Sequence, residues 1–331
     1  MPSNKQHITR RDVLTSLAGT AAMAITNSAC AQAFPSQPVT IMVGFAPGGI
    51  VDITARRIGE RLGALWNKPV IVENRTGANG NLAASSVAHS TPNAHTLLIT
   101  LYDSLVIAKA GNLKLTYDPI KDLTPVALIG DVESVFLVRS DSAYKTMSQF
   151  LEAAKAKEGK MSFGTIGVGS TFHLTMEQIN EQTGAGMLHV PYKGGTPMVT
   201  DLLGGNIESA MASSLFSKSF VETGKLRVLA VAGSRRSSVF PSVPSFSELG
   251  LRAQVPYALG VFAPAGTPAN LVAKLNADFI KVLNEPGMKA RFTEEGVTVG
   301  TLSPQDFKQR ILKEVAAIEQ VVTRNRVNLS E

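Results

Sequence analysis

Strand-like and helix-like segments alternate along this chain from residue 34 onward, and this alternation constrains the fold more than any other feature. Short β-prone runs predict strands, and longer runs with apolar residues at helical spacing predict helices. The expected strands are residues 39–43, 70–73, 96–100, 126–129, 135–138, 162–164, 187–190, 209–212, 228–231 and 258–262. The expected helices are residues 52–66, 79–89, 148–157, 171–181, 197–203, 268–283 and 304–323. The pattern predicts an α/β fold with largely parallel sheets, and 331 residues favour two domains.

Three expected helices begin with a hydroxyl residue directly before a proline. The pairs Thr196-Pro197, Thr267-Pro268 and Ser303-Pro304 predict a capping residue followed by proline at the first helical position. Asp306 follows Ser303 at the spacing of a capping box. The last helix then carries an apolar stripe for the core, made of Phe307, Ile311, Val315, Ile318 and Val322.

The turn Ala46-Pro47-Gly48-Gly49 joins the first expected strand to the first expected helix. Glycines at the mouth of a helix let the backbone come close to a ligand. The first N–H groups of the helix have no intrahelical partner, so such a turn is suited to bind an anion. Taken alone, however, the turn fits a plain chain reversal better.

Three further glycine-rich turns follow strands, at residues 73–80, 164–171 and 191–197. Ligands of open α/β sheets bind beyond the carboxyl ends of the strands, so the joint pattern favours a small-anion site. Gly164, Gly167 and Gly169 do not have dinucleotide-binding spacing, and no glycine turn continues into Lys-Ser or Lys-Thr. We therefore expect no nucleotide and no other cofactor.

Catalytic and metal-site patterns are weak. The histidines after residue 33 show neither H-x-x-x-H nor H-E-x-x-H spacing, and Ser170 lacks the G-x-S-x-G elbow. Ser170 is interpreted as a helix cap whose hydroxyl also faces the ligand, and His173 as a structural or cleft-lining residue. For Asp52 three roles remain open: a catalytic carboxylate, a hydrogen-bond partner of its own turn, or a ligand contact. Asp201 fits either a surface position or a cleft wall.

The first 33 residues have the pattern of an export signal. Arg10-Arg11 precedes the weakly apolar stretch 13–29, and two A-x-A sequences end at Ala31 and Ala33, so we expect twin-arginine export and cleavage after Ala33. The stretch is too short and weakly hydrophobic for a transmembrane helix. Cys30 is the one cysteine of the chain; its setting resembles a lipoprotein site poorly, so a soluble exported protein is favoured. A net charge of +6, without a basic stripe, disfavours nucleic-acid binding.

Taken together, the motifs resemble the receptors of tripartite tricarboxylate transporters, the Bug-type or TctC-like solute receptors. The motifs that carry this resemblance, in family order, are Phe34-Pro35-Ser36-Gln37-Pro38-Val39, Val43-Gly44-Phe45-Ala46-Pro47-Gly48-Gly49 with Asp52 and Ala55-Arg56, Val72-Glu73-Asn74-Arg75 with Gly77-Ala78, Tyr117-Asp118-Pro119 with Lys121-Asp122-Leu123, Gly169-Ser170 with His173-Leu174, Val190-Pro191-Tyr192-Lys193-Gly194, Phe240-Pro241 with Val243-Pro244, and Ala263-Pro264-Ala265-Gly266-Thr267-Pro268. Four positions depart from the family pattern, namely Gly44, Thr76, Ala83 and His95. The loss of proline at position 76 loosens that turn.

The resemblance implies a two-domain periplasmic binding protein of type II, with a Venus-flytrap closure. Domain 1 would comprise residues 34–132 and 256–331, and domain 2 residues 133–255, with crossings near 130–134 and 253–257. It also implies a carboxylate held largely through backbone groups and ordered water. The implied ligand-binding residues are Phe45, Ala46, Pro47, Gly48, Gly49, Asp52, Asn74, Gly77, Ala78, Asn79, Ser170, Thr171, His173, Lys193, Gly194, Thr196, Ser214 and Phe216.

The expected function is therefore a monomeric periplasmic receptor that delivers a small carboxylate to membrane transporter subunits. A ligand sensor for a signalling system and a periplasmic enzyme using Asp52 or His173 are the alternatives. A dicarboxylate, tricarboxylate, amino acid, aromatic acid or nicotinate-like ligand all fit the sequence.

Overall fold

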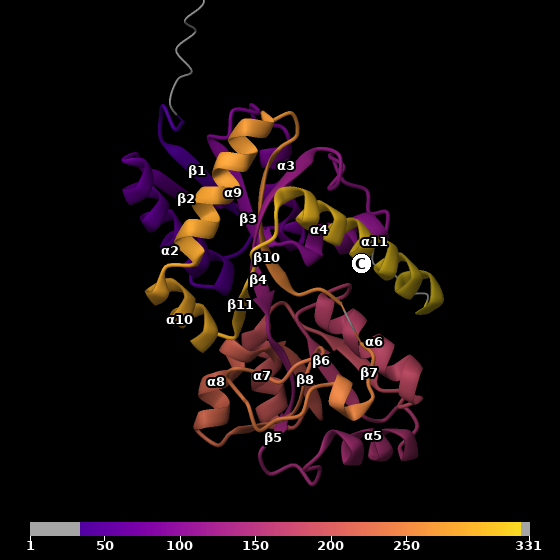
Figure 1. Ribbon diagram of the computed structural model, residues 1–331. Helices are drawn as coiled ribbons and strands as arrows, with labels where there is room; N and C mark the ends of the chain where they lie inside the picture. Colours follow the sequence, from indigo (N-terminus) through magenta and orange to yellow (C-terminus); the bar gives the residue numbers. More distant parts are fainter. Residues whose placement is uncertain (1–33, 254, 326–331) are drawn as a thin grey trace, which may run out of the picture. The chain divides into compact units, whose positions relative to one another are not determined.

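The computed structural model describes residues 34–253 and 255–325 (Figure 1). From Gln37 onward the chain forms one compact unit that contains two β-sheets. The expected signal segment, Cys30 and the expected cleavage point after Ala33 lie outside the described residues.

Sheet A has the strand order β11-β4-β10-β3-β1-β2. Its strands are β1 (Val39–Val43), β2 (Val70–Asn74), β3 (Thr96–Leu101), β4 (Leu123–Val132), β10 (Ala258–Pro264) and β11 (Val297–Val299). Strand β1 is parallel to β2 and β3, whereas β10 is antiparallel to β3 and β4, and β11 to β4.

Sheet B has the order β7-β6-β8-β5-β9. Its strands are β5 (Ser134–Arg139), β6 (Ser162–Thr165), β7 (Leu188–Pro191), β8 (Ser209–Ser213) and β9 (Leu226–Val231). Strand β6 is parallel to β7 and β8, and β5 is antiparallel to β8 and β9. Both sheets are therefore mixed, and the prediction of largely parallel sheets holds only for β1–β3 and β6–β8. The chain passes between the sheets at β4–β5 and returns at β10, and these connecting strands run antiparallel to their neighbours.

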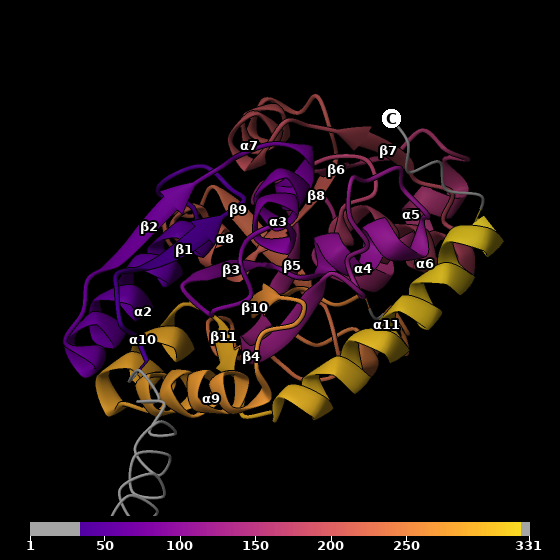
Figure 2. The same cartoon turned by 90° about the horizontal axis from the view of Figure 1, so that it is seen from above.

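Helices cover both faces of each sheet. On sheet A, α2 (Ile50–Trp66) packs with α9 (Ala269–Leu283), and α3 (Asn81–Ala88), α4 (Asp103–Ala110) and α11 (Pro304–Asn325) share one core on the other face. On sheet B, α5 (Met147–Ala156) and α6 (Thr171–Thr183) share one core, and α7 (Gly195–Gly204) and α8 (Ser214–Glu222) pack on a second. Figure 2 shows α11 passing alongside α4, and its residues pack against both α4 and α6.

Every strand and helix expected from the sequence is present, with ends shifted by a few residues. The elements not foreseen are β11, α4, α8, α10 (Pro286–Glu294) and the 3-10 turns Ala78–Gly80 and Ser247–Leu249. The stripe on α11 is confirmed: four of its members are buried, and Val322 packs partly buried against the same core.

One of the three predicted helix starts is confirmed. The N–H of Asp306 donates to Ser303 Oγ at 3.1 Å, and Ser303 Oγ donates to the Asp306 carboxylate at 2.6 Å. The other two predictions are wrong by one or two residues. Helix α7 already begins at Gly195, because a proline is also tolerated at the third helical position, where the N–H has no intrahelical acceptor. Helix α9 begins at Ala269, and Pro268 has extended backbone angles as its N-cap.

Candidate functional site

The strand ladders place the predicted site turns at two sheet edges. In sheet A, Val43 pairs with Asn74 and with Ile99, so β1, β2 and β3 end at a common edge. In sheet B, Thr165 pairs with Pro191, and β8 runs parallel to β6 on its other side. Because parallel strands end on the same side of a sheet, the turns after β1–β3 lie together, and so do the turns after β6–β8. We call the carboxyl ends of β1–β3 with their turns edge A, and the carboxyl ends of β6–β8 with their turns edge B.

The turns after β1 and β2 are in direct contact at edge A. A side chain on Gly44 would place its Cβ 2.5 Å from the Cα of Gly80, and one on Gly80 would meet the Phe45 ring at 3.2 Å. The Asn74 amide donates to the carbonyl of Phe45 at 3.0 Å. The glycines therefore let two backbone turns touch, which explains why this pair of loops is rich in glycine.

Asp52 is the hydrogen-bonding centre of this edge. Its carboxylate accepts hydrogen bonds from the Gly48 N–H and the Asn74 amide, both at 2.9 Å, and forms an ion pair with Arg56 at 2.9 Å. The side chain is buried, which alone would raise its pKa, but the hydrogen bonds from Arg56, Gly48 and Asn74 outweigh burial and leave the pKa below its usual value. Of the three roles left open for Asp52, hydrogen bonding of its own turn is the one that these contacts describe.

The turn after β2 has an unusual backbone. Four consecutive residues have positive φ angles: Gly77 at 132°, Ala78 at 47°, Asn79 at 51° and Gly80 at 86°. The left-handed region costs a non-glycine residue about 1–2 kcal/mol, so Ala78 and Asn79 carry backbone strain. Such strain gathers at ligand-binding turns.

The helix starts that follow β1 and β2 at edge A have glycine caps, whereas α4, which follows β3, begins after Tyr102. Gly49 before α2, Gly77 before the 3-10 turn and Gly80 before α3 provide no side-chain cap. The first N–H groups of α2 therefore have neither an intrahelical acceptor nor a capping oxygen. Residues 46–49 and 76–79 are exposed, so an anion in solvent can approach these donors.

Edge B is capped differently. Ser170 Oγ accepts a hydrogen bond from the His173 N–H at 3.3 Å, and Ser213 Oγ accepts one from the Phe216 N–H at 3.3 Å. Helix α7 instead has Gly194 as its N-cap, with φ 124° and no side-chain cap. Next to it Lys193 and Thr196 are exposed.

His173 and His189 stack on one another at edge B. Their ring centroids are 3.8 Å apart and their planes differ by 13°. His173 Nδ1 accepts a hydrogen bond from the Gly169 N–H at 3.1 Å, and His189 Nε2 lies 2.7 Å from Thr165 Oγ1. Burial lowers the pKa of His173 to about 4 and that of His189 to about 3. Two neutral rings thus support the start of α6.

Thr171 links edge B to edge A. Its hydroxyl lies 2.6 Å from Asp103 Oδ2 at the start of α4 and 2.9 Å from the carbonyl oxygen of Pro256 in the returning crossover. Sequence reasoning missed Asp103. A signal was available, because Asp103 follows the expected strand 96–100 in the same way that the glycine turns follow theirs. Burial raises its pKa to about 7, although the hydrogen bond with Thr171 opposes the shift.

Two of the expected ligand-binding residues, Ser214 and Phe216, pack against other parts of the protein. Ser214 is fully buried, and its Cβ is 3.2 Å from the position that a Cβ on Gly296 would take, next to the β4–β5 crossover. The Phe216 ring packs over Gly195, where an added Cβ would lie 2.8 Å from the ring. Asp201 accepts a hydrogen bond from the Tyr192 hydroxyl at 2.8 Å and another from Asn206.

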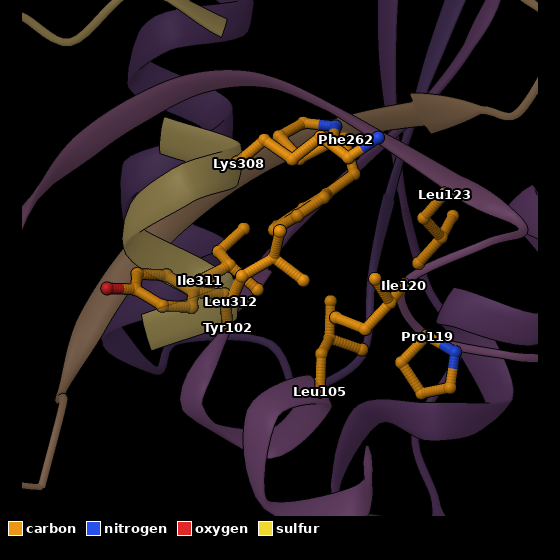
Figure 3. A pocket seen from close by; sticks show the side chains of 10 residues that line it. Tyr102, Leu105, Pro119, Ile120, Leu123, Phe262, Lys308, Ile311 and Leu312 are labelled. Atoms are coloured by element: carbon orange, nitrogen blue, oxygen red, sulfur yellow. The ribbon is translucent and has the colours of Figure 1, made fainter. Parts of the chain in front are cut away.

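Two cavities lie away from the edge turns. Figure 3 shows an apolar pocket between α4 and α11, lined by Leu105 and Ile311 among others, with a volume of about 10 Å³, space for one water at most. A cavity of about 520 Å³ with a mixed polar and apolar lining lies beside both crossovers and includes Glu133, Tyr257 and Arg310 in its wall. Within residues 34–253 and 255–325 no group of three potential metal ligands occurs. No helix in that part of the chain has the length and hydrophobicity needed to cross a membrane.

Comparison with known proteins identifies the fold and the family. A family model described as tripartite tricarboxylate transporter family receptor matches residues 54–327. BugT of Bordetella pertussis is 30% identical over 302 residues, which cover 90% of this chain and 92% of BugT. The structure of MatC from Rhodopseudomonas palustris with bound malate has a TM-score of 0.76 and 32% identity, covering 87% of this chain and 100% of MatC.

A second R. palustris protein, Rpa4515 with adipate, has a TM-score of 0.80 and 30% identity over 89% of this chain and 99% of its own. The expected fold class, a periplasmic binding protein with two domains, is confirmed by these matches. The family resemblance seen in the sequence is confirmed as well. The chain belongs to the tripartite tricarboxylate transporter receptor family, a family of periplasmic solute receptors.

Proposed function

We propose that this protein captures a small carboxylate metabolite in the periplasm and delivers it, without chemical change, to the membrane subunits of a tripartite tricarboxylate-type transporter. The observation that carries this proposal is the pair of touching, glycine-capped turns at edge A. They leave the helix N–H groups of α2 without acceptors beside the exposed residues 46–49 and 76–79. An array of backbone donors suits a carboxylate oxygen.

Edge A binds the first carboxylate in this proposal. The turns 45–49 and 77–79 supply backbone donors and room for bridging water. Asp52 and Asn74 hold the turns in shape and do not contact the ligand, because both already hydrogen-bond within the loop pair. The Gly48 N–H is likewise occupied by Asp52, so the free donors belong to the residues that follow it in α2.

Edge B binds the rest of the ligand. The uncapped start of α7 with Lys193, Gly194 and Thr196 offers positive charge and free N–H groups. Ser170 and Thr171 form the neighbouring wall. The relatives MatC and Rpa4515 have malate and adipate bound. We therefore propose a dicarboxylate as ligand, with one carboxylate at each edge.

The two sheets correspond to two domains in this proposal. Sheet A draws its strands from residues 39–132 and 258–299, and sheet B from residues 134–231, which supports boundaries at 132/133 and 255/256. Two crossings make a hinge, and closure about it buries the ligand and presents the form that the transporter recognises. Export with removal of residues 1–33, and action as a monomer, complete the proposal.

An enzymatic role is disfavoured by the same contacts. His173 is a buried neutral ring whose Nδ1 accepts a hydrogen bond from Gly169 and whose Nε2 lies 3.8 Å from a Glu177 carboxylate oxygen. The Asp52 carboxylate is held by Gly48, Asn74 and Arg56. Purified protein tests the choice. Thermal shifts across malate, adipate, citrate, glutamate and nicotinate are expected to identify a carboxylate that stabilises the fold, and calorimetry is expected to give one site per chain. Consumption of that ligand, followed by proton NMR, would contradict the receptor function.

A further inference from the structure

One short hydrogen-bonded chain connects sheet A, sheet B and the returning crossover. Asp103 Oδ2 lies 2.6 Å from Thr171 Oγ1, which lies 2.9 Å from the Pro256 carbonyl oxygen. Asp103 is 6% exposed and Thr171 3% exposed, so water does not replace these contacts. Among the described residues, no side chain hydrogen-bonds the buried Asp103 Oδ1, and the backbone N–H groups of Asp103 and Ser104 at the start of α4 are the donors next to this carboxyl group.

A count of protons determines the state of this chain. A threonine hydroxyl has one hydrogen, and a carbonyl oxygen only accepts. An ionised carboxylate also only accepts. If Asp103 is ionised, the one hydrogen of Thr171 can serve either Asp103 or Pro256, and the other contact joins two oxygens with no hydrogen between them. A protonated Asp103 donates to Thr171, and Thr171 then donates to Pro256. The protonated form satisfies both contacts.

The surroundings of Asp103 favour the same form. Burial raises the pKa of Asp103, and the negative charge of Glu314 on α11 raises it further; together they outweigh the hydrogen bonds with Thr171 and with the backbone N–H groups of Asp103 and Ser104, which lower it. The Tyr257 hydroxyl of the crossover brings no charge, because burial and Asp103 raise its pKa. The nearby Arg310 is already bound to Asp131 and Glu314. On α6, His173 Nε2 and a Glu177 carboxylate oxygen lie 3.8 Å apart. No described cation therefore pairs with Asp103.

The geometry points to Asp103 as a positioning residue that, in its protonated form, holds the start of α6 and residues 255–257 of the returning crossover against edge A. This inference rests on the proposed function, in which Ser170 and Thr171 form the ligand wall of edge B. Deprotonation removes one of the two hydrogen bonds and leaves a buried negative charge near Glu314. The start of α6 then loosens, and carboxylate binding weakens as the pH rises through about 7.

The first test needs no ligand. In Asp103→Asn the amide nitrogen donates to Thr171 at every pH and so imitates the protonated acid. Because the folded pKa lies above the unfolded value, the contribution of Asp103 to stability is present in acid and is lost between about pH 4 and pH 7. We expect the melting temperature of wild type to fall by roughly 3–6 °C relative to Asp103→Asn between pH 4.5 and pH 8.

Hydrogen exchange measures the positioning role directly. At pH 8.5, after correction for intrinsic rates, residues 171–176 are expected to exchange at least about threefold faster in wild type than in Asp103→Asn, with equal protection at pH 5.5. Asp118→Asn is the matched control. Lys109 and backbone donors lower the pKa of Asp118 despite its partial burial. The stability difference between Asp118→Asn and wild type should therefore have the opposite pH dependence. The inference would be overturned if the melting temperatures of wild type and Asp103→Asn changed in parallel with pH, or if Asp103→Asn exchanged faster at pH 5.5.

Calorimetry with malate and adipate separates this inference from the proposed function. If either acid binds, its affinity for wild type is expected to fall about tenfold per pH unit above pH 7, and its affinity for Asp103→Asn to stay constant. If neither binds but the exchange difference appears, the positioning role stands and the assignment of a dicarboxylate ligand fails. If an acid binds equally at pH 6 and pH 8.5, the positioning role is contradicted.

Discussion

Edges A and B of the two sheets use the same strand-turn-helix plan but cap their helices differently. At edge A the caps are Gly49, Gly77, Gly80 and, before α4, Tyr102, and none provides a side-chain hydrogen bond. At edge B the hydroxyls of Ser170 and Ser213 occupy the caps of α6 and α8, and only α7 has a glycine cap, Gly194, without a side-chain hydrogen bond. A helix whose first N–H groups are bonded by its own cap has fewer donors for a ligand. In the proposed function, edge A therefore binds its carboxylate through backbone donors, whereas edge B combines the free N–H groups at the start of α7 with side chains of the neighbouring wall.

The largest expected effect comes from separating the two turns of edge A. In Gly44→Ala the new Cβ would lie 2.5 Å from a backbone atom, Gly80 Cα, so a turn has to move. We expect a loss of about 1–3 kcal/mol in the free energy of unfolding and no detectable carboxylate binding. Urea unfolding and calorimetry measure the two effects. Gly287→Ala is the control, because no atom lies within 4 Å of its Cβ position, and it should bind normally.

Asp52→Asn is expected to have a smaller effect, because the turns remain in contact. The variant loses the charge of a buried carboxylate that holds the Gly48 N–H, which lowers the free energy of unfolding by about 1–2 kcal/mol. The ion pair with the half-exposed Arg56 adds little to this stability. Since the folded pKa of Asp52 is below its unfolded value, this stability is present above pH 3.8 and is lost as the pH falls further. Wild type and variant should therefore converge in acid. A constant difference down to pH 2.5 would contradict the assigned role of Asp52.

The smallest expected effect concerns edge B at neutral pH. His189→Phe keeps a ring against His173 but loses the contact with Thr165 Oγ1, at a cost of about 1 kcal/mol at pH 7.5. The folded pKa values of both histidines lie below 6.5, so the folded protein binds fewer protons than the unfolded chain and loses stability as the pH falls below 6.5. Because the variant has one such group fewer, the difference in unfolding free energy should shift by roughly 1–2 kcal/mol in its favour at pH 5, which removes or reverses the deficit.

Urea titrations at pH 7.5 and pH 5 measure this change. His89→Gln, at a helix end away from the stacked pair, is the control and should follow wild type at both pH values. An unchanged deficit for His189→Phe at pH 5 would show that the stacked pair does not carry the acid sensitivity of edge B.

The sequence predicted the elements of the site better than the details of its bonding. The run 39–43 and the turn Pro47-Gly48-Gly49 have strong local signals, because apolar β-prone residues and glycine determine their own conformation. Helix α4 lacks such a signal, because the segment 103–110 is short and most of it is buried, so it shows no amphipathic period; for Asp103 the one signal is its position after the expected strand 96–100.

Bonds between distant residues were beyond prediction for a different reason. The contact of Thr171 with Asp103 joins positions 68 residues apart, and Arg57 pairs with Glu295 across 238 residues. No local pattern encodes such a distance. The helix starts predicted at Thr196 and Thr267 were wrong because proline at the first helical position is a preference: Pro197 is the third residue of α7, and Pro268 is the N-cap of α9.

The central claim is that the glycine-capped turns of edge A bind a carboxylate through the backbone, and calorimetry on Gly49→Val tests it most directly. Gly49 has φ −78°, which valine adopts, and its Cβ would meet only the Ala46 carbonyl oxygen at 3.4 Å, so the variant should fold. The branched side chain would block the approach to the free N–H groups of α2. With the best stabiliser from the carboxylate panel, we predict at least about a hundredfold loss of affinity in Gly49→Val, equivalent to about 2.7 kcal/mol, and none in Gly287→Val. Equal affinity in wild type and a folded Gly49→Val would contradict the account.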